Sequence, residues 1–440
     1  MANPKPGDFV EVITSSEILK GTLLQSPELE KDVVIIKLSS GYNIGINKGK
    51  IRNISLVQQP PGKEEKPAAV ASKKEDSQKN LPKISILHTG GTIASKVDYR
   101  TGGVVARFTP EEILEMFPEL KGIASIDSHL IRNMWSEDMR FAHYNLMAKE
   151  IAKEAAKGFD GVIITHGTDT MHYSAAALAF ALEGIGIPVI LVGAQRSSDR
   201  GSTDAATNLV SAAYFIANSD FAGVAICMHE NMSDTAALIL PATKTRKMHT
   251  SRRDAFRPIK TTAIARVDFE ARNISFLTSS YSKKDRQSKL KLKLFNEKLK
   301  IGILKTHPNM HPAEFSAYKN FDGLVIEGFA LGQAPINQVD EFTAEHKRNL
   351  SEISSLCKKM PVIMASQSIY GRLQMNVYST ARDLQAAGVV GNLSDMTPET
   401  AFIKLAWLLS NYSKKEVKEL ITKNLRGEIA ERTEAGAFLV

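Results

Sequence analysis

The 440-residue sequence predicts an α/β protein with parallel sheets, built as two lobes that follow a small antiparallel β-barrel. Short strand-like runs recur up to residue 57, and a polar stretch that could not fill a core comes next. From Leu81 onward, apolar strand-like runs alternate with helical patterns. Alternation of this kind is typical of parallel strands joined by crossover helices.

Residues 1–57 form the predicted barrel domain. Its strand-like runs are Phe9–Ile13, Gly21–Leu24, Val33–Leu38 and Tyr42–Ile46. Short runs separated by turn residues are typical of an SH3-like barrel. The barrel has no evident catalytic group, so we expect a docking role, with a plain structural appendage as the alternative. Residues 58–81 are predicted to be a flexible linker because prolines, a glycine and mixed charged residues dominate there.

Residues 82–278 form the predicted first lobe, 279–300 a polar connection, and 301–440 the second lobe. The strands expected in the first lobe are Ile84–His88, Val162–Thr165, Val189–Val192 and Val224–Met228, and its helices are Pro110–Met116, Met139–Lys157, Ser174–Leu182 and Asp204–Ala217. The second lobe has strand-like runs at Ile301–Leu304, Leu324–Ile326 and Val362–Ala365, and helical patterns at Pro398–Leu409 and Lys414–Lys423.

Composition favours a soluble globular protein of a reducing compartment. Hydrophobic residues make up 43% and charged residues 24%, which is ordinary for a globular protein. The start has no apolar signal-peptide core, and the most apolar stretch, residues 175–194, is interrupted by Glu183 and Pro188. The only two cysteines, Cys227 and Cys357, argue against a disulfide framework. We therefore expect a cytoplasmic protein without a membrane span. The net charge of +8 permits an RNA partner without requiring one.

Two loops that follow strand-like runs carry the candidate chemistry. Ile84–His88 opens into Thr89-Gly90-Gly91-Thr92, and Gly161–Ile164 opens into residues 165–170, Thr-His-Gly-Thr-Asp-Thr. Both loops would lie at the carboxyl ends of parallel strands, where ligands gather in such sheets. Together with Lys247 they could supply a nucleophile, an acid and a base. A glycine turn with threonines as local hydrogen-bond partners is the alternative for the first loop.

These paired motifs resemble the L-asparaginase/glutaminase family, and the resemblance runs from about Leu81 to the C-terminus. It implies a larger N-terminal and a smaller C-terminal α/β lobe, with Thr89 as the primary nucleophile. It also implies a second triad of Thr168, Asp169 and Lys247, in which a lysine held by an aspartate activates a threonine. Lys247 is chosen over Lys244 because the residues after it, His-Thr-Ser at 249–251, resemble those after the family's catalytic lysine. A surface charge in a basic run is the alternative for Lys247.

The same resemblance implies three further site residues. Tyr99 lies in a stretch similar to the family's active-site flap and would orient Thr89. Ser136 and Glu137 match the pair that holds the α-amino and carboxylate groups of the substrate, although many members have glutamine in place of Glu137. A hydroxyl and a carboxylate are physically suited to an amino acid that carries both charges. A helix-cap or surface role is the alternative for all three.

Neither a metal nor a cofactor is expected in this chain. His307 and His311 have a spacing compatible with a metal pair, but Pro308 and Pro312 would break the helix that such a pair uses. His166 is interpreted as a local structural residue. Neither GxxxxGK[ST] nor GxGxxG occurs, so a partner chain would have to bind any ATP.

A barrel ahead of an asparaginase-like body resembles the ammonia-generating subunits of archaeal-type tRNA-dependent amidotransferases. Residues 371–378 and 384–389 support this resemblance. It implies that the chain hydrolyses glutamine or asparagine and passes ammonia to an E subunit, which uses ATP and Mg to convert Glu-tRNA(Gln) to Gln-tRNA(Gln). It also implies a homodimer of this chain within a heterotetramer. The alternatives are a free-standing cytoplasmic L-asparaginase and a non-catalytic RNA-associated scaffold. The intact threonine, aspartate and lysine residues argue against the scaffold, and the barrel argues against the free-standing enzyme.

Overall fold

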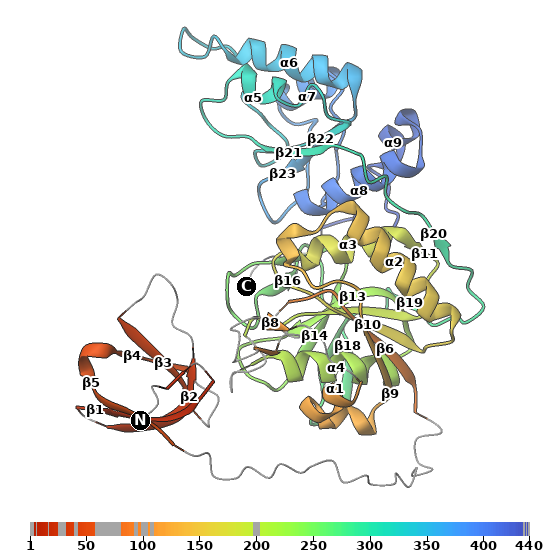
Figure 1. Ribbon diagram of the computed structural model, residues 1–440. Coiled ribbons are helices and arrows are strands. Elements are labelled where there is room, and N and C mark those ends of the chain that lie inside the picture. The colour runs from red at the N-terminus through yellow and green to blue at the C-terminus, as the bar shows by residue number, and fades with distance from the viewer. Residues whose placement is uncertain are drawn as a thin grey trace.

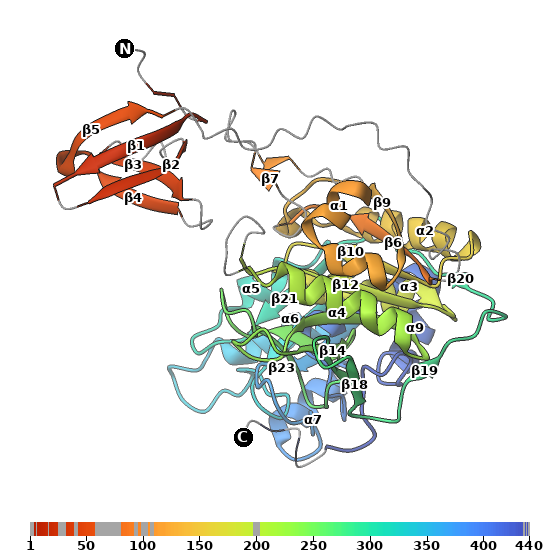
Figure 2. The ribbon, with the colours of Figure 1, turned by 90° about the horizontal axis from the view of Figure 1, so that it is seen from below.

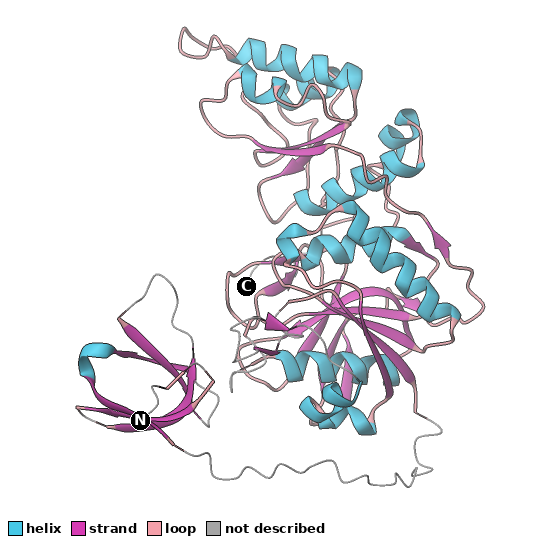
Figure 3. Ribbon diagram, viewed as in Figure 1, coloured by secondary structure: helices cyan, strands magenta, loops and turns pink. Residues whose placement is uncertain are grey.

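The computed structural model describes residues 4–5, 7–15, 17–24, 32–38, 43–57, 81–91, 96–97, 104–105, 110–196, 203–433, 436 and 438. These residues form a small antiparallel sheet, a large mixed sheet between helices, and a three-stranded parallel sheet with its own helices (Figures 1 and 3). The α/β class and the two-lobed body predicted from the sequence are confirmed.

The N-terminal sheet has five antiparallel strands in the order β4-β3-β2-β1-β5. They are β1 (Phe9–Thr14), β2 (Ile18–Leu24), β3 (Val33–Leu38), β4 (Asn43–Asn47) and β5 (Ile51–Leu56), with a 3₁₀ turn, η1 (Lys48–Lys50), before the last. Val10, Val12 and Ile36 are buried in a small core that belongs to this unit. The sequence analysis missed β5, whose burial does not alternate regularly along the strand. The five strands are consistent with a small barrel.

The large sheet runs in the order β18-β17-β14-β13-β12-β10-β6-β9. Its strands are β6 (Lys83–His88), β9 (Ser125–Leu130), β10 (Gly161–Thr165), β12 (Pro188–Val192), β13 (Phe221–His229), β14 (Ala237–Pro241), β17 (Ala265–Asp268) and β18 (Asn273–Phe276). The half from β9 to β13 is parallel, as predicted, but β14, β17 and β18 pair antiparallel. Only residues 230–236 separate β13 from β14, and a parallel crossover needs a dozen or more residues.

Helices cover both faces of the parallel half (Figures 1 and 2). They are α1 (Pro110–Met116), α2 (Phe141–Ala156), α3 (Met171–Ala181) and α4 (Ala205–Asn218). Alternate residues of the central strands point to opposite faces. Ile163 therefore packs with α1 and α4, and Ile164 packs with α2 and α3. All four helices were predicted, within a few residues of these bounds.

The small lobe is a parallel sheet in the order β21-β22-β23. Its elements are β21 (Ile301–Lys305), α5 (Pro312–Ser316), β22 (Gly323–Gly328), α6 (His346–Lys359), β23 (Val362–Ser366), α7 (Ser379–Ala386), α8 (Pro398–Asn411) and α9 (Lys414–Leu420). Helix α8 lies between this sheet and α3 of the large lobe (Figure 1). Side chains from α3, α8, β22 and β23 accordingly share one hydrophobic core.

Shorter strands complete the connections. They are β7 (Lys96–Val97), β8 (Val104–Val105), β11 (Leu182–Glu183), β15 (Thr245–Lys247), β16 (Phe256–Pro258), β19 (Ser282–Lys283) and β20 (Lys291–Leu292), together with the 3₁₀ turns η4 (Pro118–Gly122) and η5 (Ser136–Asp138). Residues 279–300, predicted as a connection, pair with the large lobe through β19 and β20. Both cysteines are buried and free. No helix in the described part of the chain is long and apolar enough to cross a membrane.

Candidate active site

Thr89 lies where β6 ends, at the carboxyl edge of the parallel sheet. Its side chain is only 2% exposed, and its hydroxyl donates to the carbonyl oxygen of Thr165 at 2.9 Å. The backbone N–H of Thr89 donates to the same oxygen at 3.1 Å. Because β6 and β10 are adjacent and in register, the two threonine-bearing loops begin side by side. The structure thus brings together the two motifs that the sequence singled out.

Glycines allow the loops to approach this closely. Gly91 has φ +84°, and a Cβ there would lie 2.6 Å from the backbone nitrogen of Gly167. Gly90 has φ +108°, and its Cβ would overlap the backbone of Met134. A Cβ on Gly167 would in turn lie 2.8 Å from that of Ser136. Only glycine combines these backbone angles with these separations.

Lys247 reaches the second loop from β15. Its Nζ donates to Thr168 Oγ1 at 2.9 Å and to Asp169 Oδ1 at 2.7 Å. The lysine side chain is 11% exposed, whereas that of Asp169 is 67% exposed. This is the lysine–aspartate–threonine contact that the resemblance implied. Lys244, the neighbour that the sequence analysis set aside, is buried and paired with Asp395 instead.

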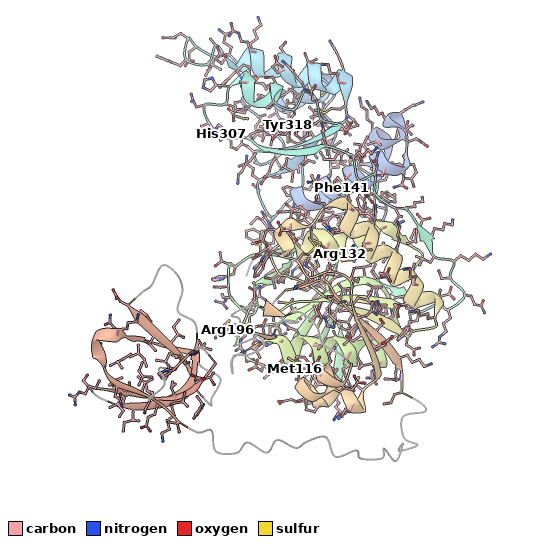
Figure 4. All side chains as sticks on the ribbon, in the orientation of Figure 1. Met116, Arg132, Phe141, Arg196, His307 and Tyr318 are labelled. Carbon is pink, nitrogen blue, oxygen red and sulfur yellow. The ribbon has the colours of Figure 1, made fainter. Side chains whose placement is uncertain are left out.

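Ser136 and Glu137 lie in η5, against the loop that holds Thr168. Ser136 is buried beside Gly167, and its carbonyl oxygen accepts a hydrogen bond from Thr170 Oγ1 at 2.6 Å. Glu137 is exposed. The stretch that precedes η5 includes Arg132, whose guanidinium donates to the carbonyl oxygen of Ile131 (Figure 4). Tyr99, the residue assigned to orient Thr89, lies outside the described residues.

Buried histidines support the loops without serving as charged groups. Burial lowers the pKa of His166 to about 4. Its Nδ1 lies 2.6 Å from the carbonyl oxygen of Gly167, and its Nε2 lies 2.8 Å from Ser174 Oγ. Its ring therefore braces the loop locally, in agreement with the sequence interpretation. His88, which the sequence analysis passed over, lies 2.8 Å from both Thr165 Oγ1 and Ser128 Oγ. No motif marks His88, so only its place just before Thr89 could have signalled it.

The two histidines that were considered as a metal pair serve local structure. His307 (Figure 4) is paired with Glu314 at 2.7 Å, and His311 precedes the first residue of α5. Among the described residues, no group of three or more His, Cys, Asp and Glu side chains is arranged to hold a metal ion.

Comparisons with known proteins cover all three parts of the chain. Residues 4–57 match the GatD N-terminal domain, 83–281 match "Asparaginase, N-terminal", and 300–421 match the Glutaminase/Asparaginase C-terminal domain. The chain is 42% identical to the D subunit of the glutamyl-tRNA(Gln) amidotransferase of Pyrococcus furiosus, over 99% of this chain and 97% of that protein. It is 41% identical to the protein of the same name from Methanococcus maripaludis, over 97% and 98% of the two chains.

The chain belongs to the D-subunit family of glutamyl-tRNA(Gln) amidotransferases.

Solved structures agree with membership of this D-subunit family. The thermostable L-asparaginase from Thermococcus kodakarensis superposes with a TM-score of 0.68 at 27% identity, covering 80% of this chain and 100% of that one. L-asparaginase I from Vibrio cholerae gives the same TM-score at 28% identity, covering 80% and 99%. A complete L-asparaginase thus corresponds to four-fifths of this chain, whereas the D-subunit relatives are covered almost from end to end. The chain therefore matches its D-subunit relatives over more of its length than it matches these two L-asparaginases.

Proposed function

We propose that this chain hydrolyses the side-chain amide of glutamine or asparagine and supplies the ammonia for amidation of Glu-tRNA(Gln). The observation that carries the proposal is the contact of Lys247 Nζ with both Thr168 and Asp169, beside Thr89 at the ends of adjacent strands. A hydroxyl and a candidate base within hydrogen-bond reach are typical of nucleophilic catalysis, and Thr89, at the end of the adjacent strand, supplies the attacking hydroxyl. The relatives named as the D subunit of an amidotransferase support a role for this chemistry in a multi-subunit enzyme.

The proposed reaction has two halves. The oxygen of Thr89 attacks the amide carbon, the C–N bond breaks, and the nitrogen leaves as ammonia with the threonine proton. Water then attacks the resulting ester, releasing glutamate or aspartate and restoring the hydroxyl. Lys247, oriented by Asp169, acts through Thr168: in the first half it relays the Thr89 proton to the leaving nitrogen, and in the second half it relays a proton of the attacking water to the Thr89 oxygen. In the structure the Thr89 hydroxyl donates its hydrogen to the Thr165 carbonyl, so the hydroxyl must give up this hydrogen bond before its proton can be transferred.

Ser136 and Glu137 would hold the charged end of the substrate. Ser136 is buried against the Thr168 loop, and Glu137 follows it toward solvent. Glu137 could accept from an α-ammonium group, whereas the carboxylate needs donors such as the Ser136 hydroxyl. Tyr99 retains its proposed role in orienting Thr89.

We further propose the assembly that this chemistry requires. The chain holds no cofactor of its own, and an E subunit that uses ATP and Mg activates the glutamate on Glu-tRNA(Gln) and amidates it. Two copies of this chain form a homodimer within a heterotetramer, in the cytoplasm.

The deciding experiment uses Thr89→Ala, reconstituted with the E subunit. The variant should lose glutamine-dependent amidation by at least about 10³-fold, because removing a covalent nucleophile leaves only binding and electrostatic effects. With concentrated ammonium it should still form Gln-tRNA(Gln), since the mutated step only generates ammonia. Thr235→Ala, at an exposed position in the loop after β13, is the matched control and should behave like the parent enzyme. Full amide hydrolysis by the parent chain alone, with no tRNA amidation under any condition, would contradict the proposal.

A further inference from the structure

The segment that carries Lys247 lies between the two lobes. Successive residues of a strand point to opposite sides. Lys247 accordingly points to the Thr168 loop of the large lobe, while Arg246 and Lys244 point to the small-lobe segment. Lys247, which is assigned to catalysis, is thus preceded by two cations, Lys244 and Arg246, that pair with acidic residues of the small lobe.

Residues 395–400, where α8 begins, make three contacts with this segment. Asp395 forms a 2.5 Å ion pair with Lys244, and Glu399 Oε1 lies 2.9 Å from Arg246 Nη2. Thr400 Oγ1 donates to the carbonyl oxygen of Thr243 at 2.8 Å. Residues 395–400 are thus attached to Arg246 within β15 and to the two residues just before β15.

Glu399 is the contact nearest to Lys247, and it is buried. Its residue is 8% exposed, and its Oε2 has no hydrogen-bond partner within the described structure. Arg246 is therefore its principal counter-charge. The Glu399 carboxylate also helps burial raise the pKa of Glu327, and it opposes the burial that lowers the pKa of His172 to about 4. These groups share one poorly solvated region, where a charge acts over a longer range than in water.

Helix α8 also supports the partner of Lys247. Thr168 lies just before α3, which packs along α8: the Tyr173 and Phe402 rings are 6.1 Å apart, and the Phe180 and Trp407 rings are 5.2 Å apart. Both sides of the lysine–threonine contact are thus attached to the same helix.

We propose that Glu399 is a positioning residue for the hydrolysis. It holds Arg246 in place, and Arg246 in turn fixes the position of the adjacent Lys247 relative to Thr168. The inference rests on the proposed function, in which Lys247 activates a threonine. Without the Arg246–Glu399 ion pair, β15 loses its contact with Glu399 of the small lobe. The distance between Lys247 and Thr168, on which proton transfer depends, is then less well fixed. The small lobe in this way sets the activity of a site whose nucleophile and lysine both lie on the large lobe.

A double-mutant cycle on Arg246→Gln and Glu399→Gln tests the proposal by amide hydrolysis and thermal unfolding. Each single variant should lower kcat by about 10-fold or more with KM nearly unchanged, since a displacement of about 1 Å can cost about 10²-fold. Arg246→Gln should also unfold at a lower temperature, because the buried Glu399 carboxylate is left unpaired. Glu399→Gln should lower it less, because the Arg246 side chain is 29% exposed. The double variant removes both charges, so its stability should recover while its kcat stays low. Neutralising the remote Lys319–Glu352 pair of the small lobe is the matched control and should leave kcat unchanged.

Lys247→Met is measured in parallel, so that the two hypotheses can fail separately. If Lys247→Met loses hydrolysis and the double variant regains the parent kcat together with its stability, Glu399 has only a structural role and the inference is wrong. A parent-like kcat in both single variants would overturn it as well. If Lys247→Met itself hydrolyses amides at the parent rate, the assignment of the site is wrong and the positioning role is lost with it.

Discussion

Three histidines beside the candidate site stay neutral because they are buried. Burial lowers the pKa of His88, His166 and His172 to about 4 in each case. A histidine near a nucleophile is often the general base, yet His166 has both ring nitrogens engaged with groups of its own lobe. The basic group in contact with Thr168 is instead Lys247.

These histidines predict how stability depends on pH. An unfolded histidine has a pKa near 6.5, so the unfolded chain binds more protons than the folded chain between about pH 6.5 and 4. The stabilisation from a neutral buried histidine is complete above pH 6.5 and is lost as the pH falls. For His166 alone, the loss between pH 7.5 and 5 is about 2 kcal/mol.

Urea unfolding of the parent and of His166→Gln at pH 7.5 and pH 5 measures this loss. The variant will be less stable at both values, since it lacks the contacts with Gly167 and Ser174. Its further loss on acidification should be smaller than that of the parent by about 2 kcal/mol. Equal losses on acidification would mean that His166 is not held neutral in the folded protein.

The sequence could predict the residues that share a motif, but not those that meet only in the fold. Thr89, Thr168 and Asp169 lie in recognisable glycine-containing loops that directly follow strands. Lys247 is followed by a characteristic sequence. Glu399 lies about 150 residues from Arg246 in an ordinary helix start, so nothing local marks the pair. Their contact exists because α8 crosses back to pack on α3.

At the scale of elements, hydrophobic pattern predicted the buried parallel strands but missed the buried antiparallel strand β14 and the half-exposed strands. The central strands β10 and β12 are buried along their whole length and read as continuous apolar runs. The edge strands β9 and β18 carry polar residues such as Asp127 and Asn273 and have little pattern. Three small-lobe helices, α5, α6 and α7, were missed as well. Of these, α5 has only one and a half turns.

The glycines between the loops yield a second prediction. Gly91→Ala adds a Cβ at φ +84° and 2.6 Å from Gly167, so it should push apart the loops that carry Thr89 and Thr168. We expect a loss of about 3 kcal/mol or more in unfolding free energy, and of nearly all hydrolysis.

Gly371→Ala is the control, because Gly371 has φ +85° but nothing within 4 Å of its Cβ position. It should cost about 1 kcal/mol and leave hydrolysis intact. Equal losses of stability in the two variants would show that the backbone angle, not the close approach, requires glycine at position 91.

At the scale of the whole molecule, the two lobes share a core and the barrel has one of its own. Buried side chains of α3 in the large lobe and of α8, β22 and β23 in the small lobe form one cluster. Phe141, at the start of α2, stacks on Phe295 at 5.5 Å and on Phe402 of α8 at 5.8 Å (Figure 4). The barrel's buried residues, among them Val12 and Ile36, form a separate cluster. Unfolding of one lobe should therefore disrupt the other.

This division predicts the outcome of shortening the chain from either end. A chain that begins at Leu81 should fold, with an unfolding free energy and a rate of amide hydrolysis close to those of the full chain, because the core cluster it removes is the barrel's own. A chain that ends at Asn411 should not fold. It loses Val417, Ile421 and Ile429 from the shared core and leaves Lys404, fully buried against Glu428 at 2.6 Å, without its counter-charge. Circular dichroism, thermal melts and hydrolysis assays of both chains make the comparison. Failure of the chain that begins at Leu81 to fold would show that the barrel contributes to the core of the body, and the predicted boundary near residue 81 would then be wrong.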